Sequence, residues 1–411
     1  MNKQTEEAVA LLKKLIATPS VSREEKAAAD IIEEFLKAKG FAPRRHYNNV
    51  WALSNDFDES QPAILLNAHI DTVRPVSGWQ HDPFCPTLEG DRLYGLGAND
   101  CGGGLVSLLQ VFLEAPVQNL IYLASAEEEI SGKQGIESVL PLLPKVEVAI
   151  VGEPTEMQPA IAEKGLMVID AVAHGKAGHA ARNEGVNAIY IAMEDIGLIH
   201  NSQCIIHNEN GGIHNSQCTI QNENPQSLPW REESGHSANE SKTPGGVYTP
   251  LSTREGAGVS LFPLISPLLG PVKATVTIIE AGTQHNVVPD ECRFTIDVRS
   301  TECYTNEQIY DILKSRLKSE LKVRSFRLSS SHISTGHPLV QRCLALGMKP
   351  FGSPTLSDQA LMRFPSLKLG PGNSARSHTA DEYICLSEIE EAIASYSSLL
   401  SALQSGQKTP A

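Results

Sequence analysis

Histidine and carboxylate side chains directly follow three short apolar runs of this chain and recur in two glycine-rich loops. These side chains are His69, Asp71, Asp100, Glu127, Glu128, Glu129, Glu153 and His378. Imidazole nitrogens and carboxylate oxygens together suit zinc, cobalt or manganese, and two such ions can share one bridging carboxylate. The residue types therefore predict a metal centre.

Each of these motifs has a simpler explanation when it is taken alone. An H-x-D sequence such as residues 69–71 arises by chance in many chains, and a run of glutamates is usually a solvated loop. Pro154 alone could account for "GEPT" as a turn. The glycine-rich loop around Asp100 lacks the Lys-Ser/Thr ending of a phosphate-binding loop. We favour a metal centre because all the features occur in one order, each at the end of an apolar run or in a glycine-rich loop.

The apolar runs that precede these residues are typical of strands in a parallel sheet. Runs at 50–54, 63–68, 119–124 and 146–151 are continuously apolar, and a helix is predicted at 102–115. Continuous apolar strands that alternate with helices indicate a mostly parallel sheet covered on both faces. Such folds build their sites at the carboxyl ends of the strands. The predicted metal ligands should therefore converge at one edge of the sheet.

From about residue 166 the pattern changes to that of a second unit. Strands and helices follow in the order β-α-β-β-α-β, which is that of a ferredoxin-like fold. The strands are predicted at 166–174, 272–281, 292–299 and 322–328, and the helices at 186–199 and 306–318. We therefore predict an α/β protein with a mostly parallel-sheet catalytic domain at 1–165 and 331–411. A ferredoxin-like domain at 166–330 is inserted between its two parts.

One segment fits neither unit. The sequence "HNSQCIIHNEN" at 200–210 recurs as "HNSQCTIQNEN" at 214–224, and a stretch rich in Ser, Asn, Gly, Pro and Glu follows. So long a stretch with so little apolar periodicity predicts a disordered insertion at 200–258. Its histidines and cysteines leave metal binding as an alternative, although no motif spacing is met.

Composition excludes several classes of partner. The formal net charge of the 411 residues is −14, which argues against nucleic acid and anionic membrane surfaces. The eight cysteines form no C-x-x-C pair, so neither a thiolate zinc site nor a redox motif is indicated. The amphipathic N-terminal helix lacks the long apolar core of a signal sequence, and no apolar run is long enough to cross a bilayer. We therefore expect a cytoplasmic protein.

Several motifs of this chain together resemble those of the M20 zinc aminoacylase/carboxypeptidase family, which includes acetylornithine deacetylase and succinyl-diaminopimelate desuccinylase. The motifs are "HIDTV", "GLGANDCGGG", "AEEEISG", "GEPT", "GKAGHAA", "GTQHNVVPDECRFTIDVR" and "GPGNSARSHTADE". The resemblance covers nearly the whole chain outside about 200–258. It implies a catalytic α/β domain with an inserted ferredoxin-like domain that usually dimerises, in agreement with the order of elements above.

The resemblance also implies a role for each matching residue in the metal centre. Two divalent ions, zinc or alternatively cobalt, would be held by His69, Asp100, Glu129, Glu153 and His378. In the family pattern His69 and Glu153 bind one ion. His378 and Glu129 bind the other ion, and Asp100 bridges the two.

Two further residues of the same motifs would act in catalysis. Glu128 resembles the general base that accepts a proton from water and hands it to the leaving amine. Asp71 would orient His69 and fix its tautomer. The family usually has Asp-Glu-Glu where this chain has Glu127-Glu128-Glu129. We therefore align Glu127 with the aspartate, which places Glu128 at the position of the base.

The substrate side of the site is implied by motifs of the inserted domain and of the C-terminal part. His179 matches a histidine that stabilises the oxyanion, often across the dimer. Asn286 and Arg299 match positions that hold the substrate, and a guanidinium suits an α-carboxylate through paired hydrogen bonds. Gly372 would supply main-chain contacts. An ordinary turn histidine and a strand-end salt bridge are the alternatives for His179 and Arg299.

The expected activity is that of a zinc-dependent amidohydrolase, a deacetylase acting on linear amides. The expected substrate is a small N-acyl amino acid, and the enzyme is expected to be a homodimer. The stretch "SPLLGPVKATVT…GTQHNVVPD" looks most like the acetylornithine deacetylases, which suggests deacetylation of N-acetylornithine in arginine biosynthesis. N-succinyl-diaminopimelate, N-acetylcitrulline and a dipeptide are alternative substrates. A second hypothesis, slightly favoured by the long insertion, is a metal-binding protein with impaired catalysis.

Overall fold

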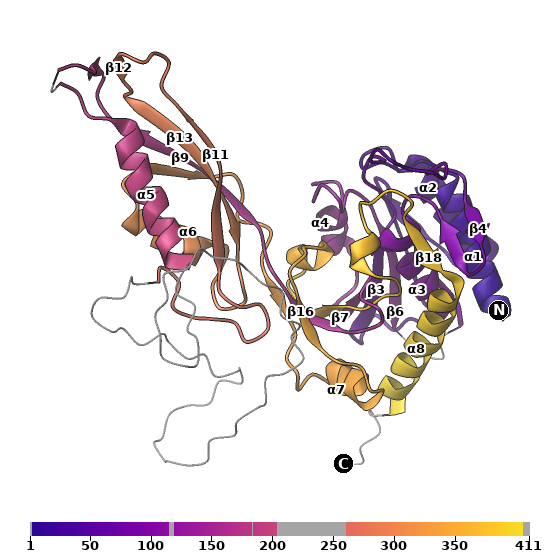
Figure 1. Cartoon of the computed structure of the whole chain (residues 1–411). Helices are drawn as coiled ribbons and strands as arrows, with labels where there is room; N and C mark the ends of the chain where they lie inside the picture. The colour runs from indigo at the N-terminus through magenta and orange to yellow at the C-terminus, as the bar shows by residue number, and fades with distance from the viewer. Residues whose placement is uncertain (1, 115–118, 183, 204–259, 406–411) are drawn as a thin grey trace, which may run out of the picture.

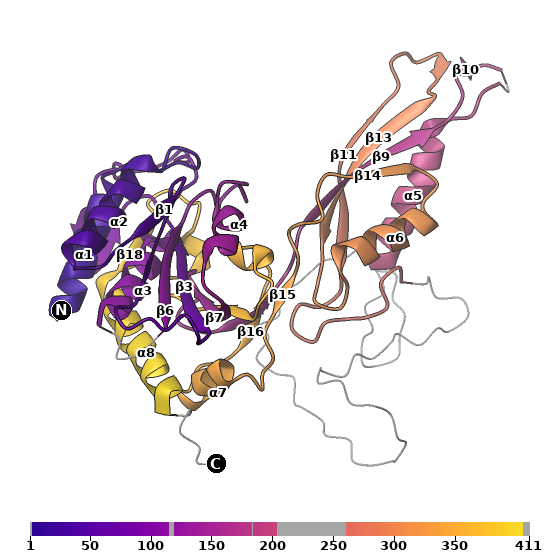
Figure 2. The ribbon, with the colours of Figure 1, turned by 180° about the vertical axis from the view of Figure 1, so that it is seen from behind.

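The computed structural model describes residues 2–114, 119–182, 184–203 and 260–405. The chain forms two lobes that are joined by extended segments (Figure 1). The large lobe contains both the N-terminal and the C-terminal parts of the chain, and the small lobe contains the part between them (Figures 1 and 2). The chain therefore leaves the large lobe, builds the small one, and returns.

The large lobe is built on one sheet whose centre is parallel. Its strands are β1 (Arg44–His46), β2 (Asn49–Leu53), β3 (Ala63–His69), β6 (Leu120–Ser125), β7 (Val146–Val151), β8 (Ala160–Glu163), β15 (Ser331–His332), β16 (Phe351–Ser353) and β17 (Ser366–Lys368). They lie in the order β1-β2-β6-β3-β7-β17-β8-β15, with β16 paired to β8. Strands β6, β3, β7 and β17 run parallel, whereas β2 and β8 join this centre in the antiparallel sense.

Strand β17 connects the two parts of the large lobe. It belongs to the C-terminal part of the chain, yet it lies between β7 and β8, which belong to the N-terminal part. Residues 366–368 pair in parallel with residues 149–151 of β7. The sheet is therefore continuous only when both parts of the chain are present.

Helices cover both faces of this sheet because successive strand residues point to opposite sides. Leu66 and Ala68 of β3 pack with α1 (Lys3–Ile16), α2 (Lys26–Ala38), α3 (Gly103–Glu114) and α8 (Leu386–Ser405). Leu65 faces the other side, where α4 (Ile136–Val139) packs. Each fully buried leucine contributes about 1.5–3 kcal/mol through removal of apolar surface from water. The sheet that carries the predicted ligands is thus held rigidly from both sides.

A close approach between α3 and the end of β7 depends on glycine. A Cβ placed on Gly104 would lie 1.7 Å from the main-chain oxygen of Gly152. Any side chain at position 104 would therefore push the first turn of α3 away from the sheet. The contact brings the loop before α3 next to the residue that follows Gly152, which is Glu153.

The small lobe has an antiparallel sheet and a core of its own. Its strands are β9 (Met167–His174), β11 (Lys273–Ala281), β13 (Glu291–Arg299) and β14 (Glu320–Val323), in the order β11-β13-β9-β14. Helices α5 (Ala188–Gln203) and α6 (Asn306–Arg316) belong to the same lobe, and Ile296 and Leu313 are among its buried residues. The predicted β-α-β-β-α-β order is therefore confirmed.

The predicted fold class, an α/β protein with a mostly parallel central sheet and an inserted ferredoxin-like unit, agrees with this architecture. The exact domain limits at 165 and 330 stay a prediction. The predicted start of the insertion at 200 is wrong, because the polar residues 200–203 form the last turn of helix α5. Ser202 is buried there, and its hydroxyl donates a hydrogen bond to the main-chain oxygen of Ile199 at 2.7 Å. Residues 204–258 of the insertion lie outside the described residues. Within the described part of the chain, none of the helices combines the length and the apolarity that crossing a bilayer needs.

Candidate metal centre and active site

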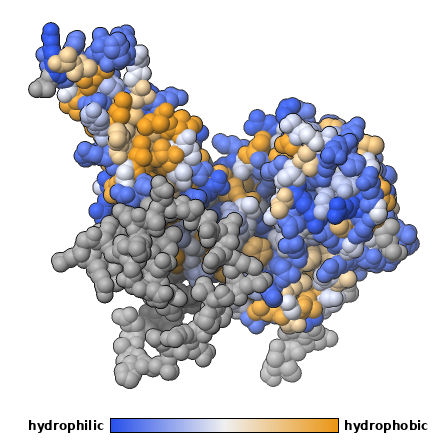
Figure 3. Space-filling model, viewed as in Figure 1, coloured by the Kyte–Doolittle hydropathy of each residue, from blue (hydrophilic) through white to orange (hydrophobic). Residues whose placement is uncertain are grey.

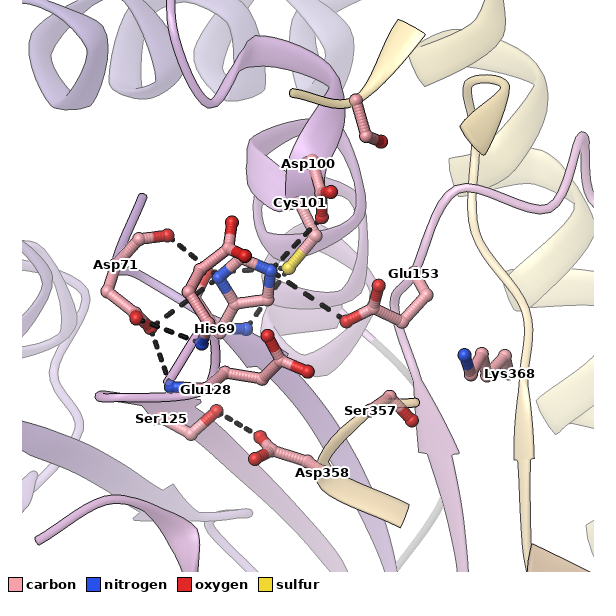
Figure 4. A network of polar contacts seen from close by, with 12 residues as sticks. His69, Asp71, Asp100, Cys101, Ser125, Glu128, Glu153, Ser357, Asp358 and Lys368 are labelled. Atoms are coloured by element: carbon pink, nitrogen blue, oxygen red, sulfur yellow. Dashed lines mark hydrogen bonds and ion pairs between the residues drawn. The ribbon is translucent and has the colours of Figure 1, made fainter. Parts of the chain in front are cut away.

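Three of the predicted metal ligands, His69, Asp100 and Glu153, lie together at the carboxyl ends of the parallel strands (Figure 4). His69 ends β3, residues 127–129 follow β6, and Glu153 follows β7. Asp100 lies in the turn η1 (Ala98–Gly102) that leads into α3, and His378 follows the turn η4 (Ser374–Arg376) of the C-terminal part. Because β6, β3 and β7 are parallel neighbours, their carboxyl ends meet at one edge of the sheet.

Asp100 stands between the two histidines. Its Oδ1 is 3.2 Å from Nε2 of His69, and its Oδ2 is 3.6 Å from Nε2 of His378. The donor atoms of His69, Asp100 and Glu129 lie within 4.8 Å of one another. Each oxygen of one carboxylate thus faces a different imidazole, which is the arrangement that a bridging ligand of two cations requires.

A second carboxylate accompanies each histidine. Glu129 Oε2 is 2.9 Å from Nε2 of His378, and Glu153 Oε1 is 3.8 Å from Nε2 of His69. Glu153 Oε1 is buried without a hydrogen-bond partner among the described residues. Donor atoms of His69, Cys101 and Glu153 also lie within 4.8 Å of one another. A buried carboxylate oxygen without a partner is costly, and a cation bound there would remove that cost.

His69 is oriented so that its Nε2 faces the carboxylates. Its Nδ1 lies 2.8 Å from the main-chain oxygen of Asp71 and donates a hydrogen bond to it. This bond holds the ring with Nε2 directed at Asp100 and Glu153. The carboxylate of Asp71 lies 3.6 Å from Nδ1, beyond hydrogen-bond distance. The orienting contact predicted for Asp71 is therefore made by its main chain.

The carboxylate of Asp71 instead fixes the loop of glutamates. It accepts hydrogen bonds from the main-chain N–H groups of Glu128 at 3.0 Å and Glu129 at 3.2 Å. The hydroxyl of Ser22 donates a third bond to it at 2.7 Å. Asp71 thus ties the end of β3 to the loop after β6, so that the ligands of both strands keep one geometry.

The consecutive glutamates have different surroundings. Glu127 has a φ of 54°, and its Oε2 accepts a bond from the N–H of Gln134, away from both histidines. Glu129 faces His378. Glu128 points toward His69 in Figure 4, and burial followed by the neighbouring Glu153 raises the pKa of Glu128 well above its ordinary value. A partly buried carboxylate with a raised pKa favours Glu128 as a proton acceptor.

The charges around Asp100 fit a pair of cations. Burial, and then the neighbouring Asp100, raises the pKa of Glu153 to about 8. Although burial opposes its charge, the surroundings, mainly Cys101 and Asp100, raise the pKa of His69 well above its ordinary value. The hydrogen bond that His378 donates to the Glu129 carboxylate raises the pKa of His378 to about 9. Protons therefore accumulate where acidic side chains meet, and divalent cations would displace them.

His179 and Asn286 lie together but away from the metal ligands. His179 ends β10 (Gly178–His179), which pairs with β12 (Val287–Val288), and the N–H of Ala180 donates to the main-chain oxygen of Asn286 at 3.0 Å. Both residues are exposed, and β10 and β12 lie at the end of the small lobe far from the large lobe (Figures 1 and 2). Within one chain they are not brought to the metal ligands.

Arg299 and Gly372 already have partners within the chain. The Nε of Arg299 donates to Oδ1 of Asp297 at 2.8 Å, so the strand-end salt bridge considered above is present. Gly372 has a φ of +84°, and a Cβ placed on it would lie 2.2 Å from Oδ1 of Asn99. Glycine is therefore needed at 372 for contact with the loop that carries Asp100.

Buried acidic residues that the sequence analysis did not single out lie behind the site. Asp358 accepts hydrogen bonds from the hydroxyl of Ser125 at 2.6 Å and from Nδ2 of Asn67 at 2.8 Å. Glu163 pairs with Lys368 at 3.1 Å, and both side chains are buried. Polar residues within apolar strands, such as Asn67 in "AILLNAH", were the available signal for this network.

Comparison with known proteins gives a consistent result. A model of peptidase family M20/M25/M40 matches residues 65–402. A curated acetylornithine deacetylase from Shigella sonnei is 34% identical over 210 residues, which span 46% of this chain and 54% of that protein. The match therefore spans about half the length of that relative.

Solved structures with the same fold cover almost the whole chain. A tripeptidase from Staphylococcus aureus matches with a TM-score of 0.66 at 17% identity, over 97% of this chain and 98% of that one. A metallo-carboxypeptidase of the M20 family from Sulfolobus solfataricus matches with a TM-score of 0.63 at 17% identity, over 97% and 99%. A dinuclear metal-binding peptidase of the M20 family from Bacillus subtilis matches with a TM-score of 0.60 at 15% identity, over 97% and 98%. At these identities the structures establish the fold alone.

Proposed function

Because this chain belongs to peptidase family M20/M25/M40, we propose that it removes the acyl group of an N-acyl amino acid, with N-acetylornithine as the substrate. The observation that carries the proposal is the position of Asp100, whose two oxygens face His69 and His378 at 3.2 and 3.6 Å. A carboxylate in this position suits a pair of hydrolytic metal ions.

The proposed metal ligands fall into two sets that share one residue. His69 and Glu153 would hold one divalent ion, His378 and Glu129 the other, and Asp100 both. Oxygen and imidazole donors in these numbers suit zinc, with cobalt as an alternative. Bound ions would lower the pKa of a water molecule and polarise the amide carbonyl of the substrate.

Glu128 is the proposed general base. Its side chain lies beside His69 in a partly buried position, and desolvation followed by the neighbouring Glu153 raises its pKa. Its carboxylate would accept a proton from the attacking water and then donate it to the leaving amine. The loop that carries it is fixed by the bonds of the Asp71 carboxylate to the main chain. That fixation supports a single position for the proton-transfer group.

Residues of the small lobe are proposed to complete the site from a second chain. His179 would donate to the oxyanion, and Asn286 beside it would contact the substrate. Arg299 would bind the α-carboxylate of the amino acid in exchange for its bond to Asp297. Because His179 and Asn286 lie at the far end of their own lobe, contact with a metal centre across a dimer explains their position better than contact within one chain.

The surface of the small lobe supports a homodimer. The edge strand β11 exposes 51% of Ile278 and 53% of Ile279, and helix α5 exposes 65% of Tyr190 and 58% of Met193. Figure 3 shows apolar residues gathered on the lobe over α5 and β11. An apolar edge strand beside an apolar helix face is typical of an interface between copies of a chain.

The first experiment measures release of free amine from N-acetyl-L-ornithine by chelator-treated protein, before and after zinc is restored. We expect activity only with zinc. N-acetyl-L-citrulline, N-succinyl-diaminopimelate and a dipeptide, tested in parallel, distinguish the alternative substrates. Zinc binding without turnover of any of them would contradict the proposed reaction and support a metal-binding protein without catalysis.

A further inference from the structure

Glu382 is a buried acid that touches the loop carrying Asp100. Its side chain is 2% exposed, and its Oε1 accepts hydrogen bonds from the main-chain N–H groups of Asn99 at 2.8 Å and Asp100 at 2.9 Å. Its main-chain oxygen accepts a further bond from the N–H of Gly95 at 3.0 Å. Glu382 therefore binds the glycine-rich loop through both its side chain and its main chain.

Residues 373–377 of the C-terminal part also form hydrogen bonds with the loop that carries Asp100. Asn99 donates to the main-chain oxygen of Asn373 at 3.0 Å and to the hydroxyl of Ser377 at 3.2 Å, and its Oδ1 accepts from the N–H of Asn373 at 3.1 Å. Gly372 leaves room for this amide. We call residues 97–100 together with 372–382 the clasp. His378 lies within the clasp, so one segment both supplies a ligand and fixes the position of another.

We propose that Glu382 is a positioning residue that holds Asp100 between the two cation positions, and that occupancy of both positions depends on it. The inference rests on the proposed function because it assumes a two-cation centre, but it does not depend on which substrate is hydrolysed.

The energetics support a functional reason for an acid at this position. Glu382 is 2% exposed and lies beside Asp100, whose side chain is 13% exposed. Two acids so close and so buried destabilise the fold unless something compensates. Bonds from consecutive N–H groups fix the main chain of Asp100 and hence the direction of its side chain. A shared ligand needs this accuracy, because it must reach two ions at once.

The test counts metal ions in Glu382→Ala and Glu382→Gln. Equilibrium dialysis against zinc gives the stoichiometry and affinities, and the absorption spectrum of the cobalt-loaded protein gives the geometry at each ion. Glu388→Ala is the matched control, because Glu388 binds Arg376 and the N–H of Cys385 in the same region but not the loop at 97–100. Thermal unfolding of each metal-free protein shows whether it is folded.

We expect the unmodified protein and Glu388→Ala to bind two ions. Glu382→Ala should bind one ion, or bind the second about 10- to 100-fold more weakly, as is usual when a residue that orients a ligand is removed. Glu382→Gln keeps an oxygen for the two N–H groups and should recover part of the affinity. Two ions bound with unchanged affinity by a folded Glu382→Ala would overturn the inference. Failure of N-acetylornithine as a substrate would leave these results unaffected.

Discussion

The proposed metal ligands and the tip of the small lobe both carry sequence motifs of the family but have very different surroundings. His69 and Asp100 lie at the ends of packed elements and contact each other directly. His179 and Asn286 are exposed where the two-residue strands β10 and β12 pair at the far end of the small lobe. The difference supports the proposal that one chain would suffice to hold the ions, whereas binding of the substrate would need a second chain. The following predictions, from the largest expected effect to the smallest, test this division.

The variant Glu128→Gln tests the proposed general base, which lies beside the proposed metal ligands. Loss of a general base should lower kcat by about 10²- to 10⁴-fold, because water must then be deprotonated without help. The variant should still bind two zinc ions in equilibrium dialysis, since the proposed ligands are unchanged. Steady-state rates and metal content measured on one sample check both expectations. An unchanged kcat would exclude Glu128 as the base.

The tip of the small lobe is tested by His179→Ala. Loss of an oxyanion donor should lower kcat by about 10²- to 10³-fold with metal content unchanged. Mixing this variant with Glu128→Gln then decides between one chain and two. If His179 acts across a dimer, a mixed dimer contains one site with both groups intact, and activity is recovered. A mixture as inactive as its two inactive components would place His179 and Glu128 of the same chain in one site. An unchanged kcat of His179→Ala would exclude His179 as the donor.

The interface that such a dimer needs is tested by Ile279→Asp. A charge at this exposed position of the edge strand β11 should oppose association, because it would have to be buried against an apolar partner. We expect a shift from dimer to monomer in light scattering and a fall in activity of about tenfold or more. Leu142→Asp, at an equally exposed position of the large lobe, is the control and should change neither. A dimeric Ile279→Asp would move the interface elsewhere.

The smallest effect concerns the stability of the metal-free protein as the pH is raised. The pKa of His378 is about 9 in the folded protein because of its bond to Glu129, above its ordinary value of 6.5. The contact between protonated His378 and Glu129 therefore makes its full contribution to the free energy of unfolding below about pH 6.5, and this contribution is lost as the pH rises through about 9. Since half of the side chain is exposed, the loss should be at most about 1 kcal/mol. Urea unfolding of the metal-free protein and of His378→Gln at pH 6 and pH 10 measures it, and an equal pH dependence in the two would contradict it.

The sequence predicts the parts of this site that follow from strand ends and fails for parts made by distant contacts. The apolar runs before His69 and Glu153 were enough to bring these residues to one edge, because parallel strands align their ends. The hydrogen bonds that the Asp71 carboxylate accepts from Glu128 and Glu129 could not be predicted, because they depend on the main-chain conformation of the loop at 127–129. Glu382 was missed because its partners at 99 and 100 lie more than 280 residues earlier in the chain.

The same reasoning applies to the fold. Periodicity predicted the long strands β9, β11 and β13 of the small lobe, which have eight or nine residues each. It was less accurate for the four-residue strand β14, which lies at 320–323 rather than at 322–328. It could not predict that β17, a strand of residues 366–368, lies between β7 and β8. So short a strand has no periodic signal, and only the packing of the whole sheet determines its place.

The central position of β17 has a consequence for the order in which the protein is made. While the chain is being synthesised, β7 and β8 emerge before the small lobe, but the strand between them emerges after it. Domains generally fold as units during synthesis, starting from the N-terminus. The small lobe, whose strands pair only with one another, can fold while the ribosome is still at work. The large sheet can be completed only after β17 has been synthesised. The proposed metal ligands can come together only after His378 has been synthesised, when translation is nearly finished.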